Sequence, residues 1–296
     1  IPGGTGFIGF NLAQFLKKKG WNVHSLSKHR PQKKRKIEGV KYIYCDVSDK
    51  KKLERKIDTH YDYIVNLSGY VDHSDKSEII LSHYNGCKNL SSLFVKSKIK
   101  KYIQIGSSIE YGKIKSPQKE NKKNFQKTFS FYGKAKLLST KYLLNLKKKY
   151  DFPVTILRLY LIYGPYQDTN RIIPFTIMNA LHNKKFKCSQ GNQLRDFLYI
   201  DDLINIIFKI LKNKKSNGEI INIGSGKPIS IKKLIKKICK LSKGGNPEFG
   251  KIAFRKDELL KLYPNLSKLK KITNWQQRIS LEEGLKKTIN YYKKIG

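Results

Sequence analysis

The stretch PGGTGFIGF, residues 2–10, holds Gly3, Gly6 and Gly9 at the spacing GxxGxxG. A tight turn and a close backbone approach need positions without side chains, and a following helix offers its first N–H groups to a pyrophosphate. Glycine turns recur in unrelated proteins, but here an amphipathic helical pattern follows over residues 10–19. We therefore predict a dinucleotide-binding loop rather than a purely structural turn. No GK[ST] follows, so this is not a Walker loop.

Downstream of this loop, strand-like and helix-like segments alternate. Short apolar strands are expected at residues 21–27, 42–47, 61–69, 101–108 and 154–164, with helices at 78–98 and 131–149. This rhythm is typical of βα units that feed a parallel sheet. Beyond Pro165 it loosens, leaving a late strand at 220–226, helices at 230–242 and 280–293, and a turn-rich connector at 244–250. The sequence predicts an α/β fold.

Composition bounds the class of protein. The chain has 296 residues, enough for one large α/β unit or two coupled domains. Its net charge is 62 − 22 = +40, which fits nucleic acid, an anionic membrane surface, acidic ligands, or a drift in composition. Because the lysines are spread along the whole chain, drift is the preferred interpretation, although it does not by itself explain the scarcity of acidic residues.

Targeting and redox signals are few. No stretch approaches the roughly 20 apolar residues of a membrane span, and no signal peptide is recognisable. The four cysteines form no CxxC pair, so neither a zinc site nor a disulfide framework is expected, and a cytoplasmic location fits. The chain opens at Ile1, directly before the glycine motif, from which we expect the first strand to be truncated.

A second motif, SFYGKAK at residues 130–136, places Tyr132 and Lys136 four residues apart on one face of an expected helix. A phenol ordinarily titrates near pH 10, so it serves as a base at neutral pH only beside positive charge. An ammonium at about 4 Å, at an effective dielectric of about 20, supplies about 4 kcal/mol, enough for about three pH units. In a lysine-rich chain a lone YxxxK can be accidental. However, GSSIEYG also places Ser107 at a strand end, where its hydroxyl can hold a substrate oxygen.

The adenosine end of the expected cofactor site lacks an acidic residue. NAD enzymes of this design usually carry Asp or Glu about 20 residues after the glycine loop. Here the second strand ends in Ser27, followed by Lys28, His29 and Arg30. These cations favour NADP(H), with NAD(H) as the alternative, unless they are only solvated loop charges. Asp46, at the end of the next strand, is a candidate for the adenine amine or a simple turn residue.

Taken together, these motifs resemble the extended short-chain dehydrogenase/reductase family, also called the NAD-dependent epimerase/dehydratase family. The resemblance covers nearly the whole chain. Asn85 in HYNGCKNL looks like the family's helix asparagine. The later landmarks are RLYLIYGP at 158–165, RDFLYIDDL at 195–203, INIGSG at 221–226 and KITNWQQRISLEEGL at 271–285.

This resemblance implies a Rossmann fold, a doubly wound parallel sheet, with a smaller C-terminal α/β substrate domain. The Rossmann domain would span 1–165 and about 196–224, and the substrate domain about 166–195 and about 225–296. A nucleotide-diphosphate sugar would be the substrate, and a homodimer the assembly. Ser107 would polarise the sugar oxygen, Tyr132 would move its proton and Lys136 would bind the nicotinamide ribose.

The resemblance also implies binding residues. The cofactor would contact Tyr132, Lys136, Gly3, Gly6, Phe7, Ile8, Gly9, Ser27, Lys28, Arg30, Asp46, Val47, Leu67 and Ser68. The substrate would contact Asn85, Ser108, Arg171 and Arg195. Arg195 would meet the diphosphate as a bidentate cation. Its structural alternative is a salt bridge to Asp196 or Asp201.

Departures from the family pattern narrow the expected activity. The Asp-Glu pair of sugar dehydratases is replaced by Ser108 and Ile109, and Glu110, one residue later, should point differently. Leu161 replaces an asparagine found in many epimerases, which puts one diphosphate contact in doubt. With NLSGYVDHS at 66–74, the pattern looks most like CDP-abequose-type deoxysugar synthases.

The best functional hypothesis is therefore NADPH-dependent reduction of an NDP-4-keto-6-deoxysugar, in surface polysaccharide such as lipopolysaccharide. The alternative is an NDP-sugar 4-epimerase, and a remote alternative is an RNA-binding, non-catalytic relative. His73 beside Asp72 is interpreted as a polar loop histidine rather than a metal ligand, because no second ligand with suitable spacing follows.

Overall fold

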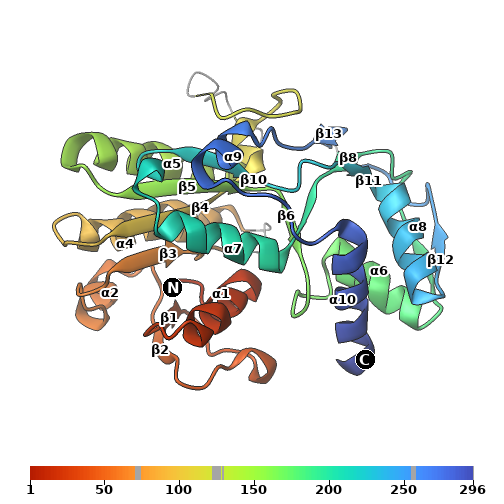
Figure 1. The fold of residues 1–296 in the computed structure, drawn as a ribbon, viewed down its shortest axis with the longest axis horizontal. Coiled ribbons are helices and arrows are strands. Elements are labelled where there is room, and N and C mark those ends of the chain that lie inside the picture. The colour runs from red at the N-terminus through yellow and green to blue at the C-terminus, as the bar shows by residue number, and fades with distance from the viewer. Residues whose placement is uncertain (71–74, 122–127, 129, 255–257, 296) are drawn as a thin grey trace.

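A computed structural model describes residues 1–70, 75–121, 128, 130–254 and 258–295. His73 and Asp72 lie outside these residues. A parallel sheet with helices on both faces forms one part of the molecule, and helices α6 (Ile172–Leu181), α8 (Ile231–Ser242) and α10 (Leu281–Ile295) gather at the other end (Figure 1). In the parts of the chain that are described, no helix is long and apolar enough to cross a bilayer.

The sheet is wholly parallel. On one side β1 (His24–Ser27) pairs with β2 (Lys41–Tyr44). On the other side the order is β3 (Tyr63–Asn66), β4 (Lys101–Ser107), β5 (Val154–Leu159), β10 (Ile220–Ile223).

Residues 1 and 2 join the two halves of the sheet. The amide of Leu26, in β1, donates to the Ile1 carbonyl at 3.0 Å, and the amide of Leu67, just after β3, donates to the Pro2 carbonyl at 2.8 Å. Residues 1 and 2 therefore lie in the middle of the sheet, with strands on both sides of them, which confirms the predicted doubly wound Rossmann architecture. The strand order reverses at residues 1–2, and ligands of such sheets bind at the carboxyl ends of the strands at this point.

Helices cover both faces of the sheet, so central strands are buried on both sides. All seven residues of β4 are buried. Ile103 and Ile105 pack in the cluster that includes α1 (Phe7–Lys18) and α7 (Ile200–Leu211), whereas Tyr102 packs with α4 (Gly86–Phe94) and α5 (Phe131–Tyr150). This division follows the two-residue period of a strand. Helix α2 (Lys50–Lys56) lies beside α4.

Two expected elements are divided in the structure. The helix expected at 78–98 consists of α3 (Lys76–Ile80), a π-helical turn η2 (Leu81–Asn85) and α4. The strand expected at 154–164 is split into β5 and β6 (Leu161–Tyr163), because the Leu161 amide turns to the Asp196 carbonyl at 3.1 Å and β6 pairs with β9 (Phe197–Tyr199). The break between β5 and β6 therefore depends on pairing with a distant segment of the chain.

Beyond β6, short strands accompany the three helices. β7 (Lys185–Lys187) pairs with β12 (Asn246–Glu248), so the segment 244–250 contains a strand and is not only a connector as expected. β8 (Leu194–Arg195) lies between β11 (Ile229–Ser230) and β13 (Lys261–Leu262). The remaining elements of the described residues are α9 (Ser267–Thr273) and the 3-10 turns η1 (Lys33–Arg35), η3 (Ser108–Tyr111) and η5 (Lys214–Ser216).

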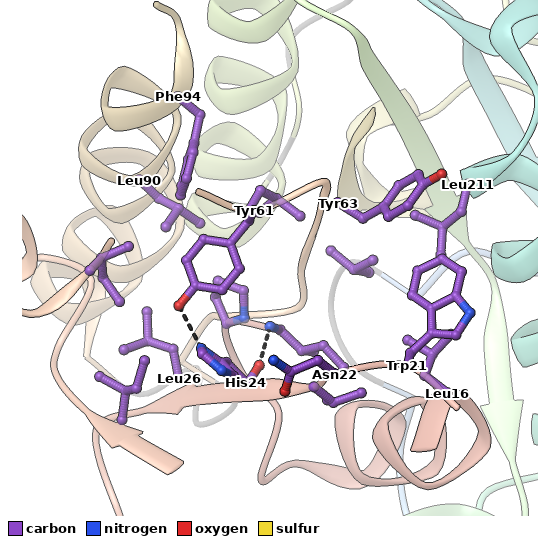
Figure 2. A pocket seen from close by; sticks show the side chains of 17 residues that line it. Leu16, Trp21, Asn22, His24, Leu26, Tyr61, Tyr63, Leu90, Phe94 and Leu211 are labelled. Carbon is purple, nitrogen blue, oxygen red and sulfur yellow. Dashed lines mark hydrogen bonds between the residues drawn. The ribbon is translucent and has the colours of Figure 1, made fainter. Parts of the chain in front are cut away.

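One pocket lies at the amino ends of β1 and β3, lined mainly by apolar and aromatic side chains such as Trp21, Leu90 and Phe94 (Figure 2). The Ile1 amino group donates to the His24 carbonyl at 2.6 Å, and the His24 Nδ1 lies 2.7 Å from the Tyr61 hydroxyl. This pocket is at the opposite edge of the sheet from the strand ends that carry the predicted site residues.

Candidate active site

The glycine loop has the close backbone contacts that a pyrophosphate-binding turn needs. Gly3 has a φ of 76°, and a Cβ there would lie 2.6 Å from the Leu67 carbonyl carbon. A Cβ on Gly9 would lie 2.3 Å from the Gly3 carbonyl oxygen. Gly6 precedes α1, whose first residues are Phe7 and Ile8. The helix start therefore sits directly on the loop, and its first N–H groups lie where an anion would be bound.

At the end of β1, Lys28, one of the cations found in the sequence, pairs with an acidic residue. Lys28 Nζ lies 3.2 Å from Asp46 Oδ2, and Asp46 also accepts bonds from the Ser48 amide (2.9 Å) and hydroxyl (2.8 Å). Burial opposes ionisation of Asp46, but these bonds and Lys28 hold its pKa below the usual value. The sequence did not predict the Lys28–Asp46 ion pair.

The other residues of this end are arranged around the glycine loop. The Ser27 hydroxyl accepts bonds from the Thr5 amide (3.3 Å) and hydroxyl (3.0 Å), which fixes β1 to the loop. The exposed Arg30 guanidinium lies 5.8 Å from the Tyr44 ring, and Val47 is buried. Lys28 and Arg30 are therefore solvent-accessible cations beside the end of β1.

Ser107 is the last residue of β4, and its amide and hydroxyl begin the η3 turn. Its Oγ accepts a long bond of 3.4 Å from the Ile109 amide, and Ser108 follows as a buried residue. The side chain of Glu110 is wholly buried in the core and bonds to Thr140 and Arg158. Glu110 therefore faces the core, and its difference from a dehydratase acid stays a prediction.

Tyr132 and Lys136 lie in the first turns of α5, which Ser130 caps by accepting from the Gly133 amide at 3.0 Å. The Lys136 Nζ is 5.9 Å from the centre of the Tyr132 ring and donates to the Ile105 carbonyl at 2.9 Å. Lys136 is only 5% exposed, so its ammonium points to the end of β4 rather than into water. Ser107 is two residues beyond Ile105, so these groups meet at one strand end.

His83 is a neighbour of Tyr132 that the sequence analysis missed. The two ring centres are 5.0 Å apart and meet edge to face at 79°. The His83 Nε2 lies 3.0 Å from the Tyr70 carbonyl, and the Ser139 hydroxyl of α5 donates to the His83 carbonyl at 2.8 Å. Asn85 lies two residues further along the same π turn. No spacing rule identifies His83, because the π turn sets which residue faces α5.

A continuous set of contacts joins the glycine loop to Tyr132. Gly3 packs on the backbone of Leu67 and Ser68, and the Ser68 amide is held by the Asn66 side chain at 3.1 Å. At Gly69 a Cβ would lie 2.0 Å from the His83 ring, and His83 in turn contacts Tyr132. The structure therefore brings the glycine loop, residues 67–68 and the Tyr132–Lys136 pair to the same edge of the sheet.

The predicted substrate residues are more dispersed. Arg195, in β8, is nearly buried and makes a salt bridge with Glu258, so the expected alternative partners Asp196 and Asp201 are wrong. Asp196 instead accepts from the Ser225 amide at 2.6 Å. Burial lowers the pKa of the Arg195 guanidinium, although Glu258 opposes this. Arg171 is exposed just before α6.

Neither a cluster of metal ligands nor a disulfide lies among the described residues. No three His, Cys, Asp or Glu side chains gather there as metal ligands would. All four cysteines are free thiols, three of them buried.

Comparison with known proteins identifies the group to which this geometry belongs. The model of the "NAD dependent epimerase/dehydratase family" matches residues 1–224. A UDP-N-acetyl-alpha-D-glucosaminuronate decarboxylase of Bacillus cytotoxicus is 29% identical, over 100% of this chain and 97% of its own length. A CDP-abequose synthase of Salmonella muenchen is 27% identical, over 98% and 96%. The structure of a UDP-glucuronic acid 4-epimerase from Bacillus cereus, in complex with UDP-glucuronic acid and NAD, superimposes with a TM-score of 0.86 at 25% identity, covering 100% and 98% of the two chains.

Proposed function

Because this chain belongs to the NAD-dependent epimerase/dehydratase family of enzymes, we propose that it is an NAD(P)-dependent nucleotide-sugar oxidoreductase. Its best-supported reaction is the NADPH-dependent reduction of an NDP-4-keto-6-deoxysugar in cytoplasmic synthesis of surface polysaccharide. One observation carries the proposal: the buried Lys136 ammonium lies beside Tyr132 at the end of the strand that carries Ser107. A phenol beside an ammonium, at the strand end that also carries a hydroxyl, suits proton exchange with a sugar oxygen.

The chain's own groups divide the chemistry between them. A nicotinamide cofactor, with its pyrophosphate on the glycine loop and its nicotinamide ribose at Lys136, would supply the hydride. The Ser107 hydroxyl donates to the sugar oxygen and polarises the carbonyl, while Tyr132 delivers the proton that the new alkoxide needs. The Lys136 ammonium offsets the negative charge that is left on Tyr132 when the proton is given up, and Lys136 would hold the cofactor ribose. Arg195, with Glu258 as its partner in the free protein, would turn to the diphosphate.

Two features favour reduction over dehydration and NADP(H) over NAD(H). Ser108 and Ile109 offer no acid–base pair for elimination of water, and the carboxylate of Glu110 is buried in the core. The exposed Lys28 and Arg30 stand at the end of β1, where a 2′-phosphate would lie. Asp46 already neutralises part of the Lys28 charge, so the preference for NADP(H) depends on the phosphate competing with Asp46 for that cation.

The test uses the full chain with NADPH or NADH and a panel of CDP- and dTDP-4-keto-6-deoxysugars. We expect NADPH oxidation with at least one sugar nucleotide. The Tyr132→Phe variant should be slower by about 10²- to 10⁴-fold, the usual contribution of a general acid, with unchanged cofactor affinity. If no member of the panel is reduced by wild-type protein, the proposed reaction is wrong.

A 4-epimerase remains the second candidate, favoured by the full-length structural match to a UDP-glucuronic acid 4-epimerase. An epimerase would interconvert two NDP-sugars with a catalytic amount of NAD and no net oxidation, which proton NMR of the sugar nucleotide distinguishes from reduction. A homodimer stays a prediction that rests on resemblance. RNA binding is disfavoured, because a non-catalytic RNA-binding protein needs neither Tyr132 nor Lys136.

A further inference from the structure

Beneath the proposed catalytic groups, Glu110 makes a set of hydrogen bonds that joins three elements. Its Oε1 accepts from the Ser107 amide at 2.7 Å. Its Oε2 accepts from the Thr140 hydroxyl of α5 at 2.7 Å, and from the Arg158 Nε and Nη2 of β5 at 3.0 and 2.8 Å. The Glu110 side chain is 0% exposed. A carboxylate buried this completely is stable only because all of these donors converge on it.

Each donor is connected to a group that the proposed reaction uses. The first bond fixes the backbone of Ser107 itself. Thr140 is four residues after Lys136, one turn further along the same face of α5. The Glu110 carboxylate is thus a direct link between the end of the strand that carries Ser107 and the helix that carries Tyr132 and Lys136.

The residues around Glu110 leave space for its carboxylate and hold that carboxylate in one position. A Cβ on Gly106 would lie 2.5 Å from the Glu110 Oε1, so the strand leaves room for this carboxylate just before Ser107. On the core side, Arg158 lies 4.2 Å from the centre of the Tyr111 ring, and the Tyr111 hydroxyl donates to the Asn222 side chain at 2.8 Å. Glu110 is therefore held from the core side while it holds the catalytic side.

We propose that Glu110 is a positioning residue, whose carboxylate sets the spacing between the Ser107 hydroxyl and the Tyr132–Lys136 pair. The inference rests on the proposed function, since it assumes that these groups act together on one sugar oxygen. It needs no contact between Glu110 and the substrate. Glu110 does not replace the missing dehydratase acid, because its carboxylate faces the core.

Replacing Glu110 itself would leave the Arg158 cation buried without its partner, and the protein would not be expected to fold well. The sharper variant is Thr140→Val, which removes only the bond from Glu110 to α5. Thr155→Val is its matched control. Thr155 is also 0% exposed, and its hydroxyl bonds to the Ser216 carbonyl at 2.8 Å and to the Ser216 hydroxyl at 3.1 Å. These bonds lie at the start of β5, away from the strand end that carries the proposed site. Thr140→Ser should keep the bond.

The measurements are kcat, KM and thermal stability of the full-length variants, with the reduction assay described above. We expect Thr140→Val to lose about tenfold or more in kcat, a size typical of misplaced catalytic groups, with KM nearly unchanged. Thr155→Val should lose as much thermal stability as Thr140→Val but keep the wild-type kcat. Thr140→Ser, which keeps the hydroxyl, should also have a kcat close to that of the wild type. Equal kcat in the two valine variants would overturn the inference.

Failure of the inference can be told apart from failure of the proposed function. If Tyr132→Phe abolishes turnover while Thr140→Val does not, only the role of Glu110 is wrong. If no substrate is turned over, crystal structures of the variants still show whether Glu110 positions Ser107 relative to Tyr132. The distance between Ser107 Oγ and Tyr132 Oη should increase relative to wild type in Thr140→Val alone, and an unchanged distance would overturn the inference.

Discussion

At the residue scale, the groups proposed for catalysis are positioned by neighbours that do not themselves react. Lys136 is oriented by its bond to the Ile105 carbonyl, and Tyr132 packs edge to face with the His83 ring. His83 is in turn held by the Tyr70 carbonyl through its Nε2. A phenol that must deliver a proton to one oxygen benefits from this restraint, because a freely rotating ring would rarely be in line.

We predict that His83→Ala lowers kcat by up to about tenfold, because an edge-to-face aromatic pair contributes about 0.5–1.5 kcal/mol. The loss arises from a mobile Tyr132 ring, so KM for the nucleotide sugar should change little. Steady-state kinetics check this, and His83→Phe, which keeps an aromatic edge, is the control. Equal losses in His83→Ala and His83→Phe would show that packing of the ring is not the cause.

The sequence predicted the residues whose chemistry depends on local spacing and missed those set by tertiary contacts. Gly3, Gly6 and Gly9, and the pair Tyr132 and Lys136, lie within short motifs that a helix or turn brings together. The partners of Lys28 and Arg195 are 18 and 63 residues away. No pattern in the chain identifies Asp46 or Glu258 as these partners, because only the fold brings them into contact.

At the element scale, the apolar strands of the Rossmann sheet were predictable, and the elements beyond Pro165 were much less so. The central strands are buried on both faces and therefore appear as short apolar runs. β8, β11 and β13 have two residues each and are held by pairing with distant segments. The π turn η2 was also missed, since its sequence continues the helical pattern of its neighbours.

Lys101, at the start of β4, connects that strand to the turn after α7. Its Nζ donates to the Asn213 carbonyl at 2.8 Å, to the Ser216 hydroxyl at 2.9 Å and to the Asn217 side chain. The residue is only 1% exposed. Burial, followed by repulsion from Lys147, lowers the pKa of Lys101 to about 8.

This pKa predicts a pH dependence of stability. An unfolded lysine titrates near pH 10.4, so between about pH 8 and pH 10 the unfolded state binds more protons and stability rises with pH. The cost of burying the Lys101 charge is present in full below about pH 8. Compared with Lys101→Met, the wild type should gain unfolding free energy across this interval.

Urea denaturation from about pH 7.5 to pH 10 provides the measurement, and the difference between the two proteins removes the titration of all other groups. Lys98→Met, at an exposed position, serves as the matched control. A difference between wild type and Lys101→Met that is independent of pH would contradict the assignment of a lowered pKa to Lys101.

At the scale of the whole molecule, the dominant feature is the net charge of +40. Self-repulsion of this size destabilises a compact state. Ion pairs such as Lys147–Asp151 and Lys287–Glu283 lie largely at the surface, where each contributes little. Acidic residues are too few to neutralise the lysines, so the repulsion among the lysines can be reduced further only by the screening that dissolved salt provides.

We predict that raising sodium chloride from about 10 mM to about 0.5 M increases the thermal midpoint by at least about 3 °C, the shift that about 1 kcal/mol produces in a chain of this size. Differential scanning fluorimetry checks this, with sucrose at equal osmolarity as the control for general solvent effects. A midpoint that falls or stays constant with salt would show that repulsion among the lysines is not a large term.

The central claim is that Tyr132, with the Lys136 ammonium beside it, exchanges a proton while a nicotinamide exchanges a hydride with a sugar carbon. It is tested most directly with NADPH deuterated at the transferable position and an NDP-4-keto-6-deoxysugar, followed by NMR of the product. The account predicts one deuterium on the sugar carbon that bore the ketone, formed by wild type and lost in Tyr132→Phe. Deuterium transfer at the wild-type rate by Tyr132→Phe would contradict it.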